Sequence, residues 1–183
     1  MNFMSERLKY RFFTKDDFSL FYSIFSNEQV MRYAWIDKFD SENDTIQFFE
    51  NFLNNENMVN NSKAYAFAVF ARENDVFIGF GDIEIHSRNA FGGVGEIGYF
   101  LLPEHWGKGY ATEIAGSLIN AGFTKLNLHK ITARCNANNA KSEAIMIKAG
   151  MTKEGELRKV RFKYGKWDDE KHYGILKDEW ESA

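Results

Sequence analysis

The chain has 183 residues, of which 44% are hydrophobic and 16% aromatic, and this composition suits one compact α/β domain spanning residues 1–183 rather than a disordered chain. The formal net charge of -3 lacks the strong basic excess of nucleic-acid-binding domains, so we expect no nucleic-acid partner. Residues 1–10 hold no apolar core of a secretory signal, and no run approaches the ~20 apolar residues of a membrane span. We therefore expect a cytoplasmic protein with no membrane partner.

The N-terminal third predicts one strand followed by helices. Thr14 is suited to cap a helix, and Asp17 at the third helical position completes a capping-box-like start. Ile46, Phe49 and Leu53 recur at helical spacing and predict an amphipathic helix. The expected elements are a strand at 8–13, helices at 14–25, 28–33 and 44–54, and an Asn-rich surface loop at 54–61.

The rest of the chain predicts a βαβ unit around a glycine-rich loop, then a helix and a hairpin. The two strands of such a unit are parallel and its crossover is right-handed. The lone Cys135 falls in the second of these strands and is expected to be buried. The expected elements are strands at 65–71 and 76–86 with a turn at 73–75, a loop at 87–93, a strand at 95–102, a helix at 112–126, a strand at 129–135, a helix at 140–149 closed by Gly150, and two long strands within 152–176 joined near 164–166.

The loop Trp106-Gly107-Lys108-Gly109-Tyr110-Ala111 joins a predicted strand to a predicted helix. Gly107 and Gly109 lack a Cβ, so the backbone is free to turn sharply and to approach a ligand closely. The first amides of the following helix have no intrahelical acceptors and lie at the positive end of the helix dipole. The loop therefore predicts a site for a pyrophosphate that needs no metal.

Two other phosphate-binding motifs do not fit this loop. A dinucleotide-binding fingerprint needs a third glycine where Thr112 stands, and a P-loop needs Ser or Thr after Gly-Lys, where Gly109 stands. An ordinary glycine-rich turn without a ligand is an alternative that the loop alone leaves open.

The wider pattern resembles the GNAT superfamily of acetyltransferases, in particular its RimJ/RimL-like branch of protein N-terminal acetyltransferases. The family pattern Q/R-x-x-G-x-G/A matches Trp106 to Ala111, with Trp106 in place of Gln or Arg. The resemblance spans nearly the whole chain and implies an α/β GNAT fold, with a mixed, mostly antiparallel sheet that splays at a parallel strand pair between flanking helices. Its further stretches include Glu6-Arg7-Leu8, Val30-Met31-Arg32-Tyr33, Glu96-Ile97-Gly98-Tyr99, Pro103-Glu104-His105, Asn139-Ala140-Lys141-Ser142, Lys148-Ala149-Gly150-Met151, Glu154-Gly155-Glu156-Leu157-Arg158 and Tyr173-Gly174-Ile175-Leu176.

The resemblance implies direct transfer of acetyl from acetyl-CoA to an amine, with the pantetheine arm between the strand that carries Glu96 and the strand at 129–135. A backbone amide, that of Phe100 or Leu101, is expected to point at the thioester oxygen, where a fixed donor contributes ~3–4 kcal/mol. The residues that the resemblance assigns to the cofactor are Phe100, Leu101, Leu102, Trp106, Gly107, Lys108, Gly109, Tyr110, Ala111, Thr112, Asn139, Ser142 and Lys148.

The attacking amine has to lose a proton, and the free energy of doing so depends on its class. At pH 7.4 the deprotonation of a lysine-like amine costs ~4 kcal/mol, whereas that of an α-amine costs ~0.5 kcal/mol. The resemblance makes Glu96 the first candidate base, acting directly or through water, and Glu84 on the preceding strand is the second. For either residue the alternative is a solvated or structural carboxylate, and geometry decides between the two.

The leaving thiolate needs a hydrogen-bond or proton donor. Ser142 matches the serine of the family's N-x-x-S stretch, and the resemblance gives it this role. Many relatives place a tyrosine one helical turn later, where this chain has Met146, which donates no proton. The alternative for Ser142 is a helix cap, and that for Asn139 is a turn residue.

The acceptor is not fixed by the fold. The resemblance favours the α-amine of a protein or peptide N-terminus. A small-molecule amine (amino acid, polyamine or aminoglycoside) and a non-catalytic acyl-CoA-binding module are the alternatives. Tyr33, Trp35 and Phe39 follow the second predicted helix and either shape the acceptor site or pack in the core. The acidic residues 168–170 either attract a cationic acceptor or are simply solvated.

Two further expectations concern partners. The four histidines show no metal-ligand spacing, so no metal is expected. Many relatives dimerise, so the resemblance suggests a homodimer.

Overall fold

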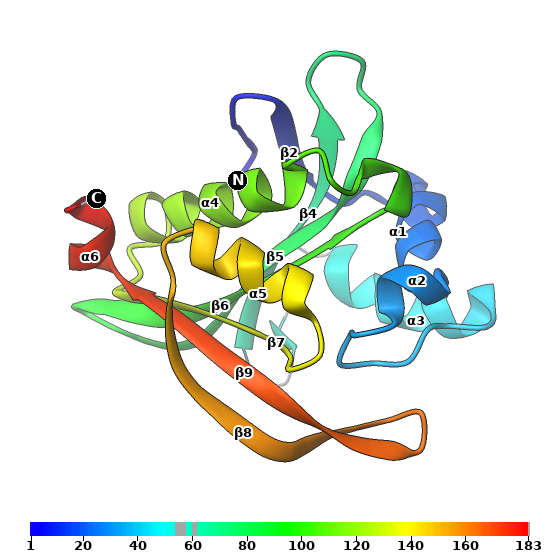
Figure 1. The fold of residues 1–183 in the computed structure, drawn as a ribbon. Coiled ribbons are helices and arrows are strands. Elements are labelled where there is room, and N and C mark those ends of the chain that lie inside the picture. The colour runs from blue at the N-terminus through cyan, green and yellow to red at the C-terminus, as the bar shows by residue number, and fades with distance from the viewer. Residues whose placement is uncertain (54–57, 60–61, 183) are drawn as a thin grey trace.

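The computed structural model describes residues 1–53, 58–59 and 62–182, and in that part of the chain nine strands form one sheet with helices on both faces (Figure 1). The strand order is β1-β2-β4-β5-β6-β7-β9-β8, with β3 paired to β4. All neighbouring strands are antiparallel except β6 and β7, which are parallel. The strands are β1 Phe3–Met4, β2 Leu8–Phe12, β3 Met58–Val59, β4 Ser62–Ala71, β5 Phe77–Asn89, β6 Gly92–Leu101, β7 Lys130–Asn136, β8 Thr152–Lys163 and β9 Lys166–Leu176.

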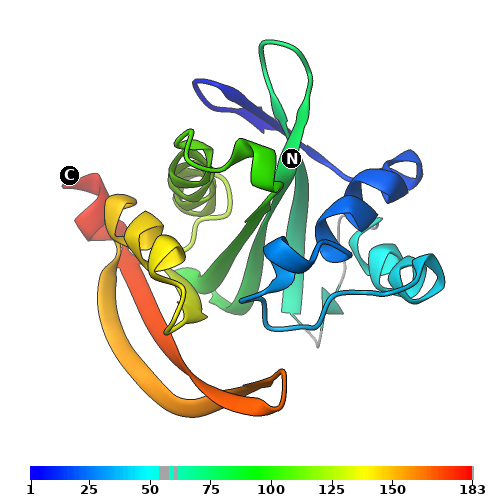
Figure 2. The ribbon, with the colours of Figure 1, turned by 45° about the vertical axis from the view of Figure 1, so that its right-hand side comes forward.

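The helices divide between the two faces of the sheet (Figures 1 and 2). The helices α4 and α5 cover one face, and α1, α2 and α3 lie against the other. The helices are α1 Phe18–Phe25, α2 Glu28–Met31, α3 Glu42–Leu53, α4 Tyr110–Thr124, α5 Ala140–Lys148 and α6 Lys177–Glu181, with short 3-10 turns at Lys15–Asp17 and Pro103–His105. No helix in the described ranges is both long and apolar enough to cross a membrane.

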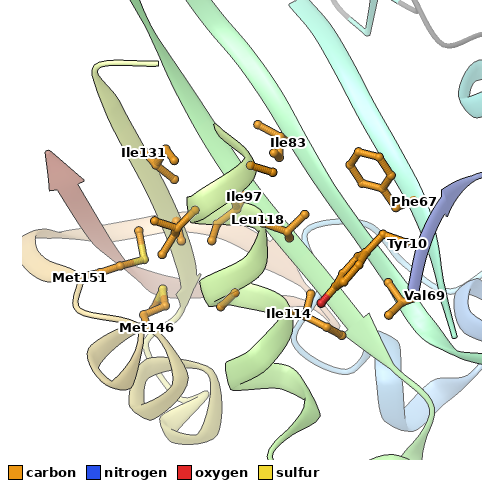
Figure 3. Packing of buried hydrophobic residues seen from close by; sticks show 14 of the residues in the cluster. Tyr10, Phe67, Val69, Ile83, Ile97, Ile114, Leu118, Ile131, Met146 and Met151 are labelled. Carbon is orange, nitrogen blue, oxygen red and sulfur yellow. The ribbon is translucent and has the colours of Figure 1, made fainter. Parts of the chain in front are cut away.

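Each face of the sheet has its own apolar core. Under α4 and α5, aliphatic side chains such as Ile97, Ile114 and Leu118 pack together with Met146 (Figure 3). Under α1 to α3 the core is aromatic and includes Phe21, Phe25, Phe49 and Phe80. Strand alternation produces this division, because successive side chains point to opposite faces.

The alternation of side chains along β6 and β7 decides on which face of the sheet their polar side chains lie. On β6, Ile97 and Leu101 belong to the α4–α5 core, whereas Phe100 packs against the aromatic core. On β7, Ala133 and Cys135 also belong to the α4–α5 core. By alternation, the even-numbered residues of both strands share the face of α1 to α3.

The sheet opens between β6 and β7. These strands pair over three positions only: Val94 with Lys130, Gly95 with Ile131, and Glu96 with Thr132. Beyond that point β6 pairs only with β5, and β7 pairs only with β9. In Figure 1, β5 and β6 rise to the right while β8 and β9 fall away, so the two halves of the sheet form a V. The mixed sheet that splays at a parallel pair is therefore confirmed.

The capping box is confirmed, because Asp17 Oδ2 accepts hydrogen bonds from the amide and the hydroxyl of Thr14 at 2.7 and 2.8 Å. The predicted loop at 87–93 is wrong, because β5 continues to Asn89 and β6 begins at Gly92. Asn89 Oδ1 accepts the Phe91 amide at 2.8 Å, and this local bond tightens the turn into a hairpin.

The remaining differences are at element ends. The third helix begins at residue 42, the helix after the glycine-rich loop begins at 110, and the strand at 3–4 and the helix at 177–181 were not predicted. Most of the predicted loop at 54–61, with the last residue of the helix predicted at 44–54, lies outside the described residues, and 58–59 pair with β4 as a strand.

Candidate active site

The glycine-rich loop presents its amides outward at the start of α4. Gly107 and Gly109 have φ values of +74° and +79°, in the left-handed region that favours glycine. Gly109 is the N-cap, and no side chain caps the helix. Within the described residues, the amides of residues 107–112 have no hydrogen-bond acceptor, and the first bond of the helix runs from Glu113 N to Gly109 O. These donors remain available to an anion, as the sequence predicted.

Arg7 braces this loop from the N-terminal segment. Its Nη1 donates to Lys108 O at 3.0 Å, its Nε donates to Glu113 Oε2 at 2.7 Å, and its guanidinium lies over the Tyr110 ring at 4.7 Å. Although burial opposes the shift, hydrogen bonds from Ser5 and Arg7 hold the pKa of Glu113 below its ordinary value. Arg7 belongs to the Glu6-Arg7-Leu8 stretch, whose sequence pattern predicts no such role.

The main chain of Phe100 is directed to β5 rather than to the gap. The Leu102 amide donates to Ile78 O at 3.1 Å, and Phe100 is the partner of Phe80 in the same register. Hydrogen-bonded pairs alternate in an antiparallel ladder, so Phe100 and Leu102 both face β5. The expectation that the Phe100 amide points at the cofactor is therefore wrong, and the Leu102 amide is directed to β5 in the same way.

The intervening residues Tyr99 and Leu101 direct their main-chain groups into the gap, again by alternation. Trp106 Nε1 donates to Leu101 O at 2.8 Å and occupies that acceptor. The amides of Tyr99 and Leu101 have no partner within the described residues. Of the two amides named from the sequence, that of Leu101 has the required direction.

Ser142 lies opposite β6 on the α4–α5 face. Its Oγ is 3.2 Å from the Tyr99 hydroxyl, and its amide donates to Asn139 Oδ1 at 3.1 Å. Asn139 is thus the N-cap of α5, and the structure brings both residues to the edge of the gap. Lys148 is exposed at the other end of this helix, ~9 Å along the axis from Ser142, and is not brought to the same place.

Tyr99 is a candidate that the sequence analysis missed as a functional residue. Burial raises the pKa of Tyr99 to about 12, so its hydroxyl remains a proton donor at neutral pH. It contacts Ser142 where Met146 offers no donor. Its alternation with Ile97 and Leu101 was the available signal, since it places the tyrosine on the face of α5.

Three carboxylates gather on the opposite face of the gap. Glu96 accepts a hydrogen bond from Arg134 Nε at 2.8 Å, and Glu84 is its cross-strand partner. Asp82 lies over Gly98, where a Cβ would approach Asp82 Oδ1 to 2.4 Å. Burial and the negative charges of Glu84 and Glu96 raise the pKa of Asp82 to about 7. The two candidate bases, Glu96 and Glu84, therefore lie side by side on one face, and Asp82 is an addition.

A cavity of about 380 Å³ lies on this second face, between residues 34–35 and the β8–β9 hairpin. Its lining includes Trp35, Arg134, Arg161, Phe162, Lys163 and Glu170. The hairpin curves under the sheet toward the connection after α2 (Figure 2), and the ammonium of Lys163 donates to carbonyls of that connection. The cavity is thus formed by segments far apart in the sequence.

The aromatic and acidic candidates separate in the structure. Trp35 lines the cavity, but Phe39 packs against the aromatic core and Tyr33 is outside the lining. Asp168 contacts Lys166 at 3.4 Å and Asp169 contacts Lys159 at 3.3 Å, so only Glu170 of the acidic segment lines the cavity.

Comparison with known proteins agrees with this geometry. The sequence model of the family described as Acetyltransferase (GNAT) domain matches residues 7–152. The chain belongs to the GNAT acetyltransferase family. This GNAT chain is 35% identical over 181 residues to an uncharacterised N-acetyltransferase of Bacillus subtilis, YnaD, covering 98% of this chain and 99% of the relative.

Two solved structures share the fold of this GNAT enzyme. One is a spermidine N-acetyltransferase from Vibrio cholerae in complex with CoA and spermine, with a TM-score of 0.82, 23% identity and 96% and 99% of the two chains covered. The other is a ribosomal-protein-S5-alanine acetyltransferase from Vibrio fischeri, with a TM-score of 0.76, 24% identity and 98% of each chain covered. The TM-scores and identities of the two comparisons are similar, so the shared fold favours neither a polyamine nor a protein N-terminus as acceptor.

Membership of the family makes the protein an acetyl-CoA-dependent N-acetyltransferase. The free amides after Gly107 and the open edge of β6 fit the diphosphate and the arm of such a cofactor. Within residues 1–53, 58–59 and 62–182, no cluster of three His, Cys, Asp or Glu side chains is arranged to hold a metal ion.

Proposed function

We propose that this enzyme acetylates the α-amine of a protein or peptide N-terminus, as one GNAT domain of residues 1–183 in the RimJ/RimL-like branch. The observation that carries the proposal is the charge of the cavity beside Glu96. Three cationic side chains, Arg134, Arg161 and Lys163, line it with a single carboxylate, that of Glu170. Such a lining repels a polyamine, whose charges are all positive, and tolerates a peptide, which carries one ammonium.

The chemistry of Glu96 also favours an α-amine. Its Oε1 accepts a hydrogen bond from Arg134 Nε at 2.8 Å, and a carboxylate is in general a weak base. A weak base suffices for an α-amine, whose deprotonation at pH 7.4 costs ~0.5 kcal/mol, but not for a polyamine nitrogen, which costs ~4 kcal/mol. We assign Glu96, directly or through water, as the group that receives the proton.

The other residues have positioning roles on the opposite side of the gap. The amides of residues 107–112 would hold the diphosphate, and the Leu101 amide would hold the carbonyl oxygen of the acyl group. Acetyl-CoA supplies an activated acyl group and a thiolate that leaves. The hydroxyl of Ser142, supported by that of Tyr99, would donate a hydrogen bond to that thiolate.

A polyamine is the second candidate acceptor, and one observation favours it. Asp82, Glu84 and Glu96 share a face near the point where β6 and β7 separate, where a second ammonium group would be attracted. The non-catalytic acyl-CoA-binding module is the third candidate, and the positions of Glu96 and Ser142 on either side of the gap weigh against it.

Thiol release from acetyl-CoA across a panel of acceptors tests the proposal. The panel holds a peptide with a free N-terminus, the same peptide with a blocked N-terminus and an internal lysine, spermidine, an aminoglycoside and free amino acids. We expect turnover with the free N-terminus and at least tenfold lower kcat/KM with spermidine. Faster turnover of spermidine would favour the second candidate, and binding of acetyl-CoA without turnover of any amine would favour the third.

Two variants test the assigned roles. Glu96→Gln should lower kcat/KM by about 100-fold and remove the acidic limb of its pH profile, because general-base catalysis contributes ~10²–10⁴-fold. Glu84→Gln is the matched control on the neighbouring strand and should retain that limb. Ser142→Ala should lower kcat without changing the KM for the amine, because its contact is with the leaving group. Light scattering on the same preparations measures the molar mass in solution and tests whether the enzyme is a homodimer, as the family resemblance suggests.

A further inference from the structure

The cations that line the acceptor cavity differ in how many of their donors the protein already uses. Lys163 is buried, and its ammonium donates to Met31 O at 2.7 Å, Ala34 O at 3.0 Å and Ile36 O at 2.5 Å. An ammonium has three donors, so Lys163 is saturated and has a structural role. Asp37, 3.8 Å from its Nζ, is 75% exposed and adds little.

The two guanidinium groups are not saturated. Arg161 donates from Nε to Glu170, and its Nη1 lies 3.5 Å from Tyr33 O. Arg134 donates from Nε to Glu96 at 2.8 Å, and its Nη1 lies 3.6 Å from Glu170. In the part of the chain that the structure describes, neither Nη2 donates a hydrogen bond. Each of these nitrogens carries two N–H donors.

Glu170 does not balance this charge. Its carboxylate is 4% exposed and lies between Arg161, Arg134 and His172, whose Nε2 is 2.9 Å from Oε1 without the angle of a hydrogen bond. Among the buried and half-buried groups, two carboxylates, those of Glu96 and Glu170, face three cations, because the third nearby carboxylate, that of Asp37, is 75% exposed and solvated. An uncompensated guanidinium in a partly closed cavity favours binding of an anion.

The site is therefore polarised across the side chain of Arg134. This residue contacts Glu96 where β6 and β7 separate and also reaches Glu170 in the cavity. The carboxylates Asp82, Glu84 and Glu96 lie on the gap side, and Arg161 and Lys163 lie on the cavity side. An acceptor that carries an ammonium and an anion on neighbouring atoms matches both halves.

We propose that the acceptor carries a carboxylate close to its reactive amine, and that Arg161 and Arg134 bind this carboxylate in the cavity while the amine lies at Glu96. This proposal names the substrate class of the acceptor site and rests on the proposed acetyl transfer. The carboxylate has two sources: the α-carboxylate of a free amino acid, or an acidic side chain in the first or second residue of a peptide. A cavity of about 380 Å³ accommodates either.

Wild-type enzyme with matched acceptors is the first test. One arm compares glutamate with its α-amide, and the other compares peptides that begin with Glu, Gln or Lys and are otherwise identical. In one of the two arms we expect a 10- to 100-fold higher kcat/KM for the acceptor that carries the carboxylate, mainly because its KM is lower. The arm that shows this difference identifies whether the carboxylate comes from a free amino acid or from an acidic side chain. Equal kcat/KM values in both arms, or a preference for Lys, would overturn this proposal and leave the proposed acetylation of an N-terminal α-amine standing. Absence of turnover on every amine would instead remove the proposed acetylation of an N-terminal α-amine.

Variants of Arg161 test whether this side chain binds the carboxylate of the acceptor. Arg161→Gln should raise the KM for the preferred acceptor by about 10- to 100-fold and leave the KM for acetyl-CoA unchanged. Arg158→Gln removes the same charge from an exposed position of the same strand, outside the cavity lining, and should behave as wild type. Arg161→Lys, which keeps the charge, should recover part of the loss.

A charge reversal at Arg161 distinguishes binding of the acceptor's carboxylate from a merely structural role. Arg161→Glu should invert the preference and acetylate the Lys peptide better than the Glu peptide, provided that circular dichroism shows a folded protein. If Arg161→Gln and Arg161→Glu are folded and their kcat/KM falls by the same factor for all acceptors, Arg161 stabilises the β8–β9 hairpin and does not bind the carboxylate of the acceptor. If neither variant folds, the matched acceptors on the wild-type enzyme decide alone.

Discussion

The carboxyl group of Asp82 makes the stability of this protein depend on pH in a defined direction. Burial and the nearby charges of Glu84 and Glu96 raise its pKa from 3.8 to about 7 in the folded chain. Below pH 3.8 the group is protonated in both the folded and the unfolded chain and contributes nothing. Between pH 3.8 and 7 only the folded chain holds the proton, so the free energy of unfolding falls as the pH rises. Above pH 7 this loss is complete.

The size of the effect follows from the shift. About three pKa units correspond to ~4 kcal/mol, at ~1.4 kcal/mol per unit. The Asp82 residue as a whole is half-buried, so solvent screening makes this an upper bound, and we expect a loss of about 2 kcal/mol. Asp82→Asn removes the titration with little change in shape. The variant should match the wild type near pH 4 and exceed it by about 2 kcal/mol at pH 8.

Urea unfolding at pH 4.5, 6, 7 and 8 measures the difference, and calorimetry should show a Tm of the variant about 4–8 °C higher at pH 8. Asp16→Asn is the control, because Asp16 is exposed and is not part of the cluster of Asp82, Glu84 and Glu96. A stability difference between Asp82→Asn and wild type that stays constant from pH 4.5 to 8, or a variant less stable at pH 8, would refute the assignment of the raised pKa to Asp82.

Three further changes have expected outcomes. Lys163→Met should lower the free energy of unfolding by about 2–4 kcal/mol in urea titrations, because the carbonyls of buried Met31 and Ala34 and of half-buried Ile36 lose their donor, whereas Lys166→Met at an exposed position should stay within about 0.5 kcal/mol. Gly109→Ala should raise the KM for acetyl-CoA and cost about 1 kcal/mol of stability, because φ is +79° and the new Cβ lies 3.3 Å from Arg7. Gly116→Ala, in open space on the same helix, should instead stabilise by about 1 kcal/mol. Tyr99→Phe should lower kcat with little change in either KM, measured by thiol release, and an unchanged kcat would contradict the role of its hydroxyl.

The features that the sequence determined are local or periodic. The left-handed conformations of Gly107 and Gly109 and the capping box of Thr14 and Asp17 depend on neighbouring residues only. The open helix start after Gly109 follows from the absence of a capping side chain. The parallel pair follows from the βαβ order, because a crossover through a helix returns the chain in the same direction.

Other features depended on tertiary contacts that no local pattern contains. The direction of the Phe100 amide is set by its register with β5, and a shift of one residue would reverse it. The bond from Tyr99 to Ser142 joins residues 43 positions apart. The cavity exists because Lys163 holds the hairpin to Met31, 132 positions away. Composition and periodicity determine which face a side chain takes, whereas the meeting of distant charged groups depends on how the two halves of the sheet diverge and how the hairpin folds back beneath them.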